Sequence, residues 1–198
     1  MNTLTIPLFP LKTVLFPHGI LPLRLFEPRY LDMVSACMKT GTGFGVCLIS
    51  AGEEAGAAAS IHKVGTLAKI TDWEMREDGL LGITIRGEQR LAVLSQHIEP
   101  NQLIMATANT IPDEPEAEIL PAYGVLVELL RQALEQAGHP YTEMVKKYAE
   151  AGWVGCRLAE LLPFKLSFKQ ELLELNDPLQ RLQRITVALE ELADQKRE

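Results

Sequence analysis

Residues 5–30 read TIPLFPLKTVLFPHGILPLRLFEPRY, a stretch dense in large apolar side chains and interrupted by proline at positions 7, 10, 17, 22 and 28. Proline removes a backbone donor and clashes with the preceding helical turn, so one long helix is excluded. The stretch predicts two short extended segments, 4–9 and 20–25, joined by a loop through residues 17–19. Glu27-Pro28 then predicts the start of a helix, because proline suits the first helical position.

The composition is that of an ordinary soluble globular protein: 198 residues, 47% hydrophobic, 23% charged, with a net charge of −7. No apolar run reaches the roughly 18 residues of a membrane span, and the N-terminus lacks the pattern of a secretion signal. Three cysteines without ligand-like spacing indicate reduced thiols. We therefore expect a cytoplasmic protein with no metal and no cofactor.

After the predicted helix over 29–39, short apolar segments alternate with glycine-containing turns. Asp78-Gly79 is a hairpin signal, Gly87-Glu88 predicts a second turn, and the small residues of 51–60 predict a surface loop. The remaining strands are predicted over 43–50, 61–72, 67–75, 80–86, 90–96 and 102–109. About seven short strands favour a closed or nearly closed β-barrel, which leaves few strand edges open.

The pattern changes at 111–118, where two prolines and four acidic residues predict a linker. Helices are expected from Pro121 to a stop at 138–140, over 142–151 and over 154–162, with a capping box at 167–170. Asp177-Pro178 predicts the cap of a last helix. Its inward stripe is Leu179, Leu182, Ile185, Leu189 and Leu192. The sequence thus predicts an α+β protein, with a β-barrel subdomain over 1–112 and an α-helical bundle subdomain over 119–198.

Motifs for chemistry are sparse. The chain contains no Gly-Lys dipeptide and so no P-loop, and neither a G-x-S-x-G elbow nor an H-E-x-x-H pattern. Its four histidines are scattered near predicted loops and strand ends, so we predict no catalytic residue. Glu27 and Arg29, which flank Pro28, have two interpretations: a charged contact site, or a structural ion pair that ties helix to barrel. The structural interpretation is favoured.

Four blocks in the first 30 residues carry a resemblance: 7–11 (PLFPL), 14–17 (VLFP), 21–23 (LPL) and 26–30 (FEPRY). With 43–45, 64–66, 87–90, 169–174 and 181–182, they resemble the Lon protease N-terminal domain family over nearly the whole chain. The resemblance implies a PUA-like β-barrel followed by helices. It makes Phe26, Glu27, Pro28, Arg29 and Tyr30 a structural signature.

In the full protease this domain precedes an ATPase module and a serine–lysine protease domain. This sequence has neither a Walker motif nor room for a protease module, so it is similar to stand-alone members and proteolysis is not carried over. The resemblance implies a non-catalytic role, the binding of unfolded or apolar protein segments, together with weak self-association. We predict the contacts in the loop after the first strand, at Leu11, Val14, Leu15, Phe16 and Ile20; the alternative is that these side chains fill the barrel mouth.

Two other classes of function stay open. PUA-like barrels include RNA-binding modules, but the charge of −7 and the absence of a long basic run count against nucleic acid. A small molecule in a groove between barrel and bundle would need converging titratable groups, which residue spacing does not show.

Overall fold

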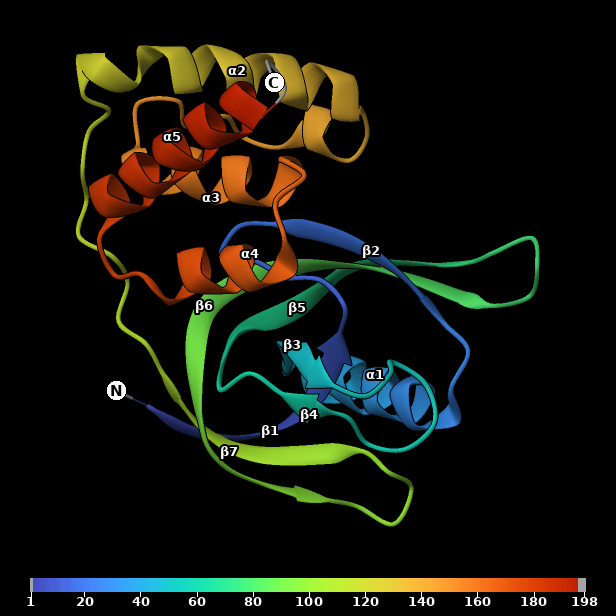
Figure 1. Cartoon of the computed structure of the whole chain (residues 1–198). Coiled ribbons are helices and arrows are strands. Elements are labelled where there is room, and N and C mark those ends of the chain that lie inside the picture. The colour runs from blue at the N-terminus through green and yellow to red at the C-terminus, as the bar shows by residue number, and fades with distance from the viewer. Residues whose placement is uncertain (1, 196–198) are drawn as a thin grey trace. The chain divides into compact units, whose positions relative to one another are not determined.

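The computed structural model describes residues 2–195 and divides the chain into two compact units, Met1–Pro112 and Asp113–Glu198. The first unit is built from strands and one helix, and the second from helices (Figure 1). This is the predicted α+β architecture, a barrel-like sheet followed by a helical region.

The strands of the first unit close into a ring. β1 pairs with β7 on one edge and runs parallel to β3 on the other, so the order β1-β7-β6-β5-β3 returns to its start. β2 adds to β6, and β4 adds to β3. The bounds are β1 Thr3–Leu11, β2 Ile20–Leu25, β3 Phe44–Ala51, β4 Ser60–Ile61, β5 Val64–Met75, β6 Leu81–Ile98 and β7 Ile104–Thr110. Seven strands were expected, but the strand predicted over 61–72 is interrupted between β4 and β5.

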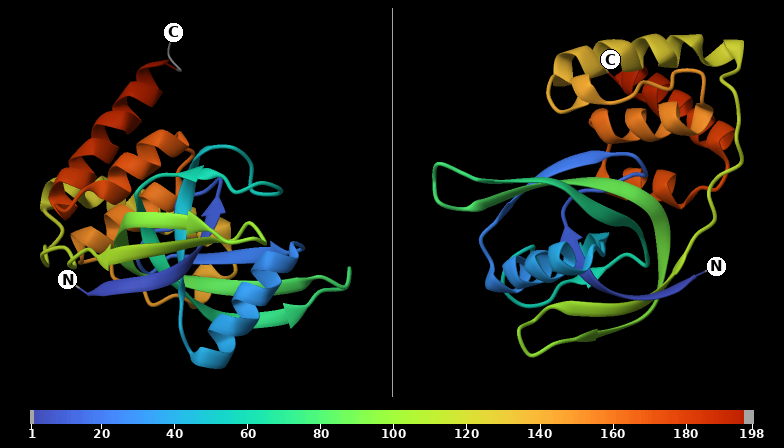
Figure 2. Two further views of the ribbon diagram at one scale, coloured as in Figure 1. Left: turned by 90° about the horizontal axis from the view of Figure 1, so that it is seen from below. Right: turned by 180° about the vertical axis from the view of Figure 1, so that it is seen from behind.

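The hairpin between β5 and β6 forms where the sequence predicts it. Gly79 adopts φ +78°, and the Asp78 carboxylate accepts a hydrogen bond of 3.0 Å from the Leu80 amide. Glycine supplies the left-handed conformation and aspartate stabilises the turn through its own side chain. The hairpin extends beyond the ring in every view (Figures 1 and 2).

The turn predicted at Gly87-Glu88 is wrong, because β6 runs without interruption from Leu81 to Ile98. Gly87 serves instead for close approach: a Cβ there would lie 2.2 Å from the Phe16 carbonyl oxygen. The Gly87 carbonyl accepts from the His18 amide at 2.7 Å, and its amide donates to Gly19 at 2.9 Å. The loop after β1 is therefore held against the middle of β6.

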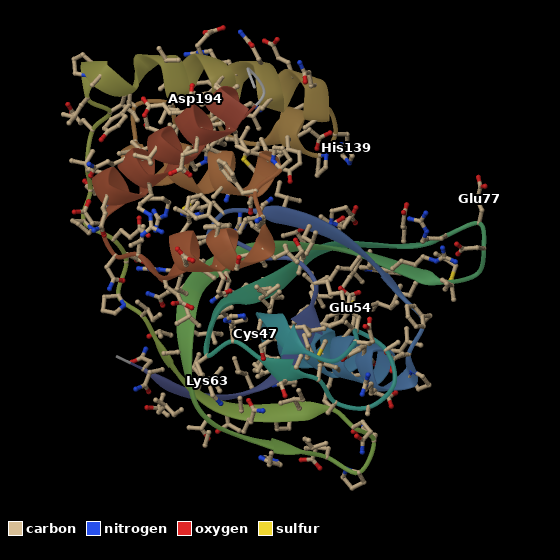
Figure 3. The ribbon with its side chains drawn as sticks, in the orientation of Figure 1. Cys47, Glu54, Lys63, Glu77, His139 and Asp194 are labelled. Atoms are coloured by element: carbon tan, nitrogen blue, oxygen red, sulfur yellow. The ribbon has the colours of Figure 1, made fainter. Side chains whose placement is uncertain are left out.

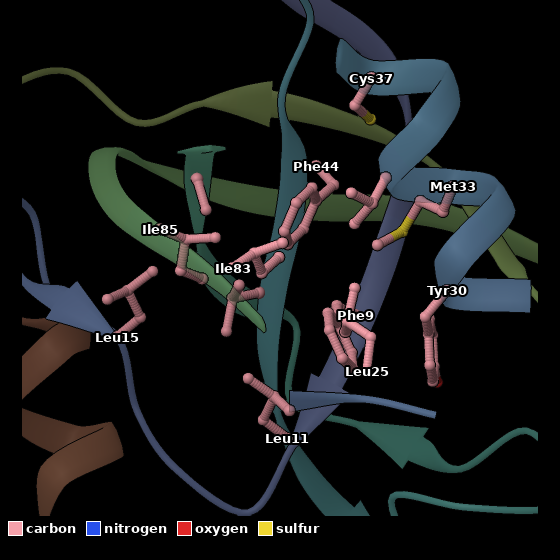
Figure 4. Close-up of a cluster of buried hydrophobic side chains, with 13 residues drawn as sticks. Phe9, Leu11, Leu15, Leu25, Tyr30, Met33, Cys37, Phe44, Ile83 and Ile85 are labelled. Atoms are coloured by element: carbon pink, nitrogen blue, oxygen red, sulfur yellow. The ribbon is translucent and has the colours of Figure 1, made fainter. Parts of the chain in front are cut away.

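The helix of the first unit, α1 (Pro28–Thr40), begins at the predicted proline and ends at Gly41, which is left-handed at φ +67°. Its buried face joins β1, β3 and β6 in one apolar cluster (Figure 4). The Phe9 and Tyr30 rings stack there with centroids 4.1 Å apart. A second cluster, around Leu8, Leu91 and Ile104, fills another part of the ring.

The second unit contains α2 (Gly124–Ala137), α3 (Ala151–Leu161), α4 (Leu166–Glu174) and α5 (Pro178–Gln195), with short 3-10 turns at Pro121–Tyr123 and Tyr141–Glu143. The helix predicted over 142–151 is wrong. Residues 149–151 instead form backbone hydrogen bonds with residues 117–119. The Ile119 amide donates to the Ala149 carbonyl at 2.9 Å, and the Ala151 amide donates to the Ala117 carbonyl at 2.8 Å. Those backbone groups are therefore not available to a helix.

The predicted helix caps have mixed outcomes. Asp177 caps α5 as expected, since its carboxylate accepts from the amides of Leu179 (2.9 Å) and Gln180 (3.1 Å). The capping box at 167–170 is wrong, because α4 already starts at Leu166 without a side-chain cap. Of the predicted stripe on α5, Leu182 and Ile185 are fully buried, Leu179 and Leu189 are partly buried, and Leu192 is exposed.

An arginine is buried in the core of the second unit. The Arg181 guanidinium binds both carboxylate oxygens of Glu114, one of them at 2.7 Å. It also donates to the carbonyls of Leu172 and Leu175, each at 2.9 Å. This pairing attaches the acidic segment before α2 to helix α5. Burial of Arg181 is tolerated because its charge is paired and hydrogen-bonded.

Candidate binding pocket beside strand β2

The first unit contains a cavity of about 160 Å³ next to β2. Four segments contribute to it: the end of β1, the whole second half of β2 and the residues after it, the start of α1, and the loop after β3. The lining residues are Phe9, Leu11, Pro22, Leu23, Arg24, Leu25, Phe26, Glu27, Tyr30 and Glu54.

The floor of the pocket is apolar. Phe9, Leu25 and Tyr30 are buried and lie close together (Figure 4). Phe26 differs from them, because it is 60% exposed. A large exposed ring beside an apolar hollow gives a partner an apolar surface to cover.

The start of α1 is held by an ion pair. The Arg29 guanidinium lies 2.8 Å from the Glu27 carboxylate and donates to the Gln102 carbonyl at 3.0 Å. It also lies 4.7 Å from the centre of the Tyr30 ring, within cation–π range. Arg29 is buried, so these contacts are largely shielded from water. The ion pair favoured from the sequence is therefore present.

The Tyr30 phenol stays protonated near neutral pH. Burial raises its pKa above 10.0, and the carboxylates of Glu27 and Glu54 act in the same direction, against the nearby Arg29. Glu54, labelled in Figure 3, accepts a hydrogen bond from the backbone amide of Lys12, whose ammonium pairs with Glu53. The mouth of the pocket thus carries charged groups around an apolar floor.

The loop residues proposed from the sequence as peptide contacts are not a free surface. Leu11, Val14, Leu15 and Phe16 are buried and Ile20 is half-buried. The loop is anchored by the Thr66 hydroxyl, which donates to the Leu15 carbonyl, and by the contacts at Gly87 described above. Its apolar side chains consequently pack inward. Leu11 is the one of the five that lines the pocket.

Two exposed residues of the hairpin were not foreseen. Trp73 and Met75 are 58% and 68% exposed near the end of β5. Trp73 pairs across the sheet with Ile83, and Ile83 pairs with Leu23 of β2. Met75, Leu81 and Leu25 form a second row in the same way. Directly paired residues share a face, so Trp73 and Met75 lie on the same face of the sheet as Leu23 and Leu25, which line the pocket.

Other chemistry finds little support among residues 2–195. No group of three or more histidine, cysteine, aspartate or glutamate side chains there could hold a metal ion. Burial raises the pKa of Cys37 and Cys156, and that of Cys47 to about 12, so these thiols stay protonated near neutral pH. None of the helices in that range has the length and apolar character needed to cross a membrane.

The architecture is shared with solved N-terminal domains of Lon proteins. A crystal structure of a Lon N-terminal domain protein from Xanthomonas campestris matches with a TM-score of 0.77 and 34% identity, covering 93% of this chain and 98% of that one. The N-terminal domain of the Lon protease of the Mycobacterium avium complex matches with a TM-score of 0.55 and 18% identity, over 90% and 94% of the two chains. At that identity the second comparison supports the fold alone.

The family is shown by the sequence itself. Residues 5–191 match the ATP-dependent protease La (LON) substrate-binding domain, and the chain belongs to this family. Among full proteases it is 25% identical to Lon protease 1 of Syntrophobacter fumaroxidans, over 92% of this chain and 23% of that protein. It is 27% identical to Lon protease 2 of Herpetosiphon aurantiacus, over 98% and 24%. The chain thus spans about a quarter of the length of these relatives.

Proposed function

We propose that this protein binds exposed apolar segments of other polypeptides without cleaving them, and that the pocket beside β2 receives them. The observation that carries the proposal is the exposed Phe26 ring beside the cavity, with an apolar floor beneath it. Membership of a substrate-binding family supports the same class of ligand.

The size of the pocket suits one large apolar side chain. Its volume is about 160 Å³, and an apolar cavity of about 150 Å³ is known to hold a benzene molecule. Trp73 and Met75, which are exposed on the same face of the sheet, offer apolar contacts for neighbouring side chains of the same segment. A short apolar stretch, rather than a single residue, is therefore the ligand that we propose.

The contribution of Phe26 can be estimated from its exposure. With Phe26 60% exposed, a ligand that covers half of this surface buries on the order of 60 Å² of it. At about 25 cal/mol per Å² this is worth roughly 1.5 kcal/mol, or about tenfold in Kd.

The test is fluorescence anisotropy with a labelled, permanently unfolded carboxymethylated protein. We expect saturable binding that survives added salt, a roughly tenfold weaker Kd for Phe26→Ala, and an unchanged Kd for Met38→Ala. Met38 is a matched control, because it is also apolar and exposed in the first unit but does not line the pocket. Absence of saturable binding up to high micromolar protein, or equal binding by Phe26→Ala and the wild type, contradicts the proposal. Binding of RNA that falls steeply with salt would favour the nucleic-acid alternative.

A further inference from the structure

We propose that the bound segment adds to the sheet as an extra strand along the open edge of β2, and that it carries a basic residue next to its apolar anchor. This inference rests on the proposed function and specifies its mode. Strand addition obtains affinity from main-chain hydrogen bonds and specificity from the pockets that take alternate side chains.

Among the residues that the structure describes, one edge of β2 has no strand partner. Within residues 2–195, β6 is the one strand that pairs with β2, over Ile20–Leu25 against Leu81–Arg86. The opposite edge of β2 therefore presents backbone groups without a strand partner, which is the template that an added strand requires.

The direction of those groups follows from the register. The Gly87 amide donates to the Gly19 carbonyl at 2.9 Å, so the backbone carbonyl of Gly19 points toward β6. Gly19 and Gly87 continue the register that pairs Ile20 with Arg86. Backbone groups alternate in direction along a strand. The amide and carbonyl groups of Leu21, Leu23 and Leu25 therefore also point toward β6. The backbone groups of Pro22 and Arg24 consequently point away from β6.

Proline at position 22 agrees with this assignment, since a proline within a sheet has its nitrogen on an open edge. The edge then offers the Pro22 carbonyl together with the amide and carbonyl of Arg24. Three groups at this spacing can bond an extended segment over a short length, and the missing donor at Pro22 limits indiscriminate pairing.

The pocket lies on this same edge. Its lining includes six consecutive residues, from Pro22 to Glu27. Side chains along a strand alternate between the two faces, so a cavity on one face would contact every second residue. Contact with all four residues of β2 from Pro22 to Leu25 indicates that the cavity runs along the edge of the strand. A segment paired with β2 therefore lies in the pocket.

Charge specifies the occupant further. Two ion pairs on the rim are internally balanced, Glu27 with Arg29 at 2.8 Å and Arg24 with Asp78 at 3.1 Å. On the side of the loop after β3, Glu53 pairs with the Lys12 ammonium, whereas the Glu54 carboxylate accepts from the uncharged backbone amide of Lys12. A lysine or arginine beside the apolar anchor complements this excess negative charge.

A backbone methylation scan tests the mode. The probe is a fluorescein-labelled nine-residue peptide with a central phenylalanine flanked by lysine and arginine, prepared also with a single methyl group on each backbone nitrogen in turn. We expect anisotropy titrations to show about tenfold weaker binding for methylation at the two positions, two residues apart, whose amides bond to the Pro22 and Arg24 carbonyls, and no change at the position between them. Contacts through side chains alone do not produce a period of two.

A pair of protein variants gives an independent readout. Arg24→Pro and Arg24→Ala both lose the guanidinium and its pairing with Asp78, but only the proline variant loses the backbone donor. We expect Arg24→Pro to bind the peptide about fivefold more weakly than Arg24→Ala. Far-UV circular dichroism checks the fold of both variants. If Arg24→Pro does not fold, the methylation scan on the wild type decides.

The outcomes separate the mode from the function. Binding that is insensitive to methylation at all positions overturns strand addition and leaves the proposed function intact. A peptide with glutamate in place of its basic residues should bind at least threefold more weakly at low salt, and equal binding overturns the basic preference. Failure of the unmodified peptide and of the unfolded protein to bind overturns both the mode and the proposed function.

Discussion

Gly87→Ala is expected to destabilise the protein strongly although it adds a single methyl group. The new Cβ would lie 2.2 Å from the Phe16 carbonyl oxygen and 3.1 Å from its carbonyl carbon. Since carbon atoms do not approach oxygen so closely, the loop after β1 must move away by about 1 Å. That movement disrupts the two hydrogen bonds that Gly87 makes with His18 and Gly19, of 2.7 and 2.9 Å.

The expected loss is about 2–4 kcal/mol, since each bond is worth about 1 kcal/mol net and more when a partner stays buried and unpaired. A loss of this size lowers the melting temperature by roughly 4–16 °C. Urea denaturation followed by far-UV circular dichroism measures it as a lower midpoint. Gly124→Ala is the control. Gly124 has φ −55°, and a Cβ added there would have nothing within 4 Å, so this variant should be more stable by about 0.5 kcal/mol. A Gly87→Ala midpoint equal to that of the wild type would refute the close-approach reasoning.

Three further changes test other parts of the structure. Met75→Ala should alter stability by less than about 0.5 kcal/mol yet weaken peptide binding, because its exposed side chain offers apolar contacts to the bound segment; unchanged affinity would remove the hairpin from the site. Arg181→Met should cost about 3–5 kcal/mol in urea denaturation, because it leaves the Glu114 carboxylate without its partner, and adding Glu114→Leu should recover part of the loss. Burial raises the pKa of Cys47 from 9.0 to about 12, so above pH 9 the unfolded chain releases a proton that the folded chain keeps. The contribution of this thiol to the free energy of unfolding should therefore fall by about 1.4 kcal/mol per pH unit up to about pH 12, and Cys47→Ala should show a shallower slope between pH 9 and pH 10.5.

The elements predicted well from the sequence are those that local chemistry determines. Pro28 begins α1, Asp177 caps α5, and Asp78-Gly79 forms the hairpin, each through contacts within a few residues. The β-barrel followed by helices was likewise predicted, because short apolar strands separated by turn residues favour few other arrangements.

The errors concern residues whose role depends on distant parts of the chain. Gly87 carries the local signal of a turn, but its conformation is decided by the loop at Phe16. Residues 149–151 have an acceptable helical pattern, yet they pair with 117–119, which lie far away in sequence. No local signal distinguishes these cases, since glycine serves turns and close approaches equally.

The sequence places the candidate contacts in the loop after the first strand, whereas the pocket is lined mainly by β2 and the residues after it. An apolar run shows that side chains avoid water, not which of them remain accessible. Val14, Leu15 and Phe16 are buried by tertiary contacts, whereas Phe26, assigned only to a structural signature, is exposed beside the pocket. The pocket itself could not be predicted, because four separate segments line it.

The measurement that tests the central claim most directly is a nuclear magnetic resonance titration of the isotope-labelled protein with the nine-residue peptide. The account predicts that amide shifts change along 21–27 and at Tyr30, and that hydrogen exchange at the Arg24 amide slows as the peptide saturates. Shifts confined to 124–195, with β2 unaffected at saturation, would contradict it.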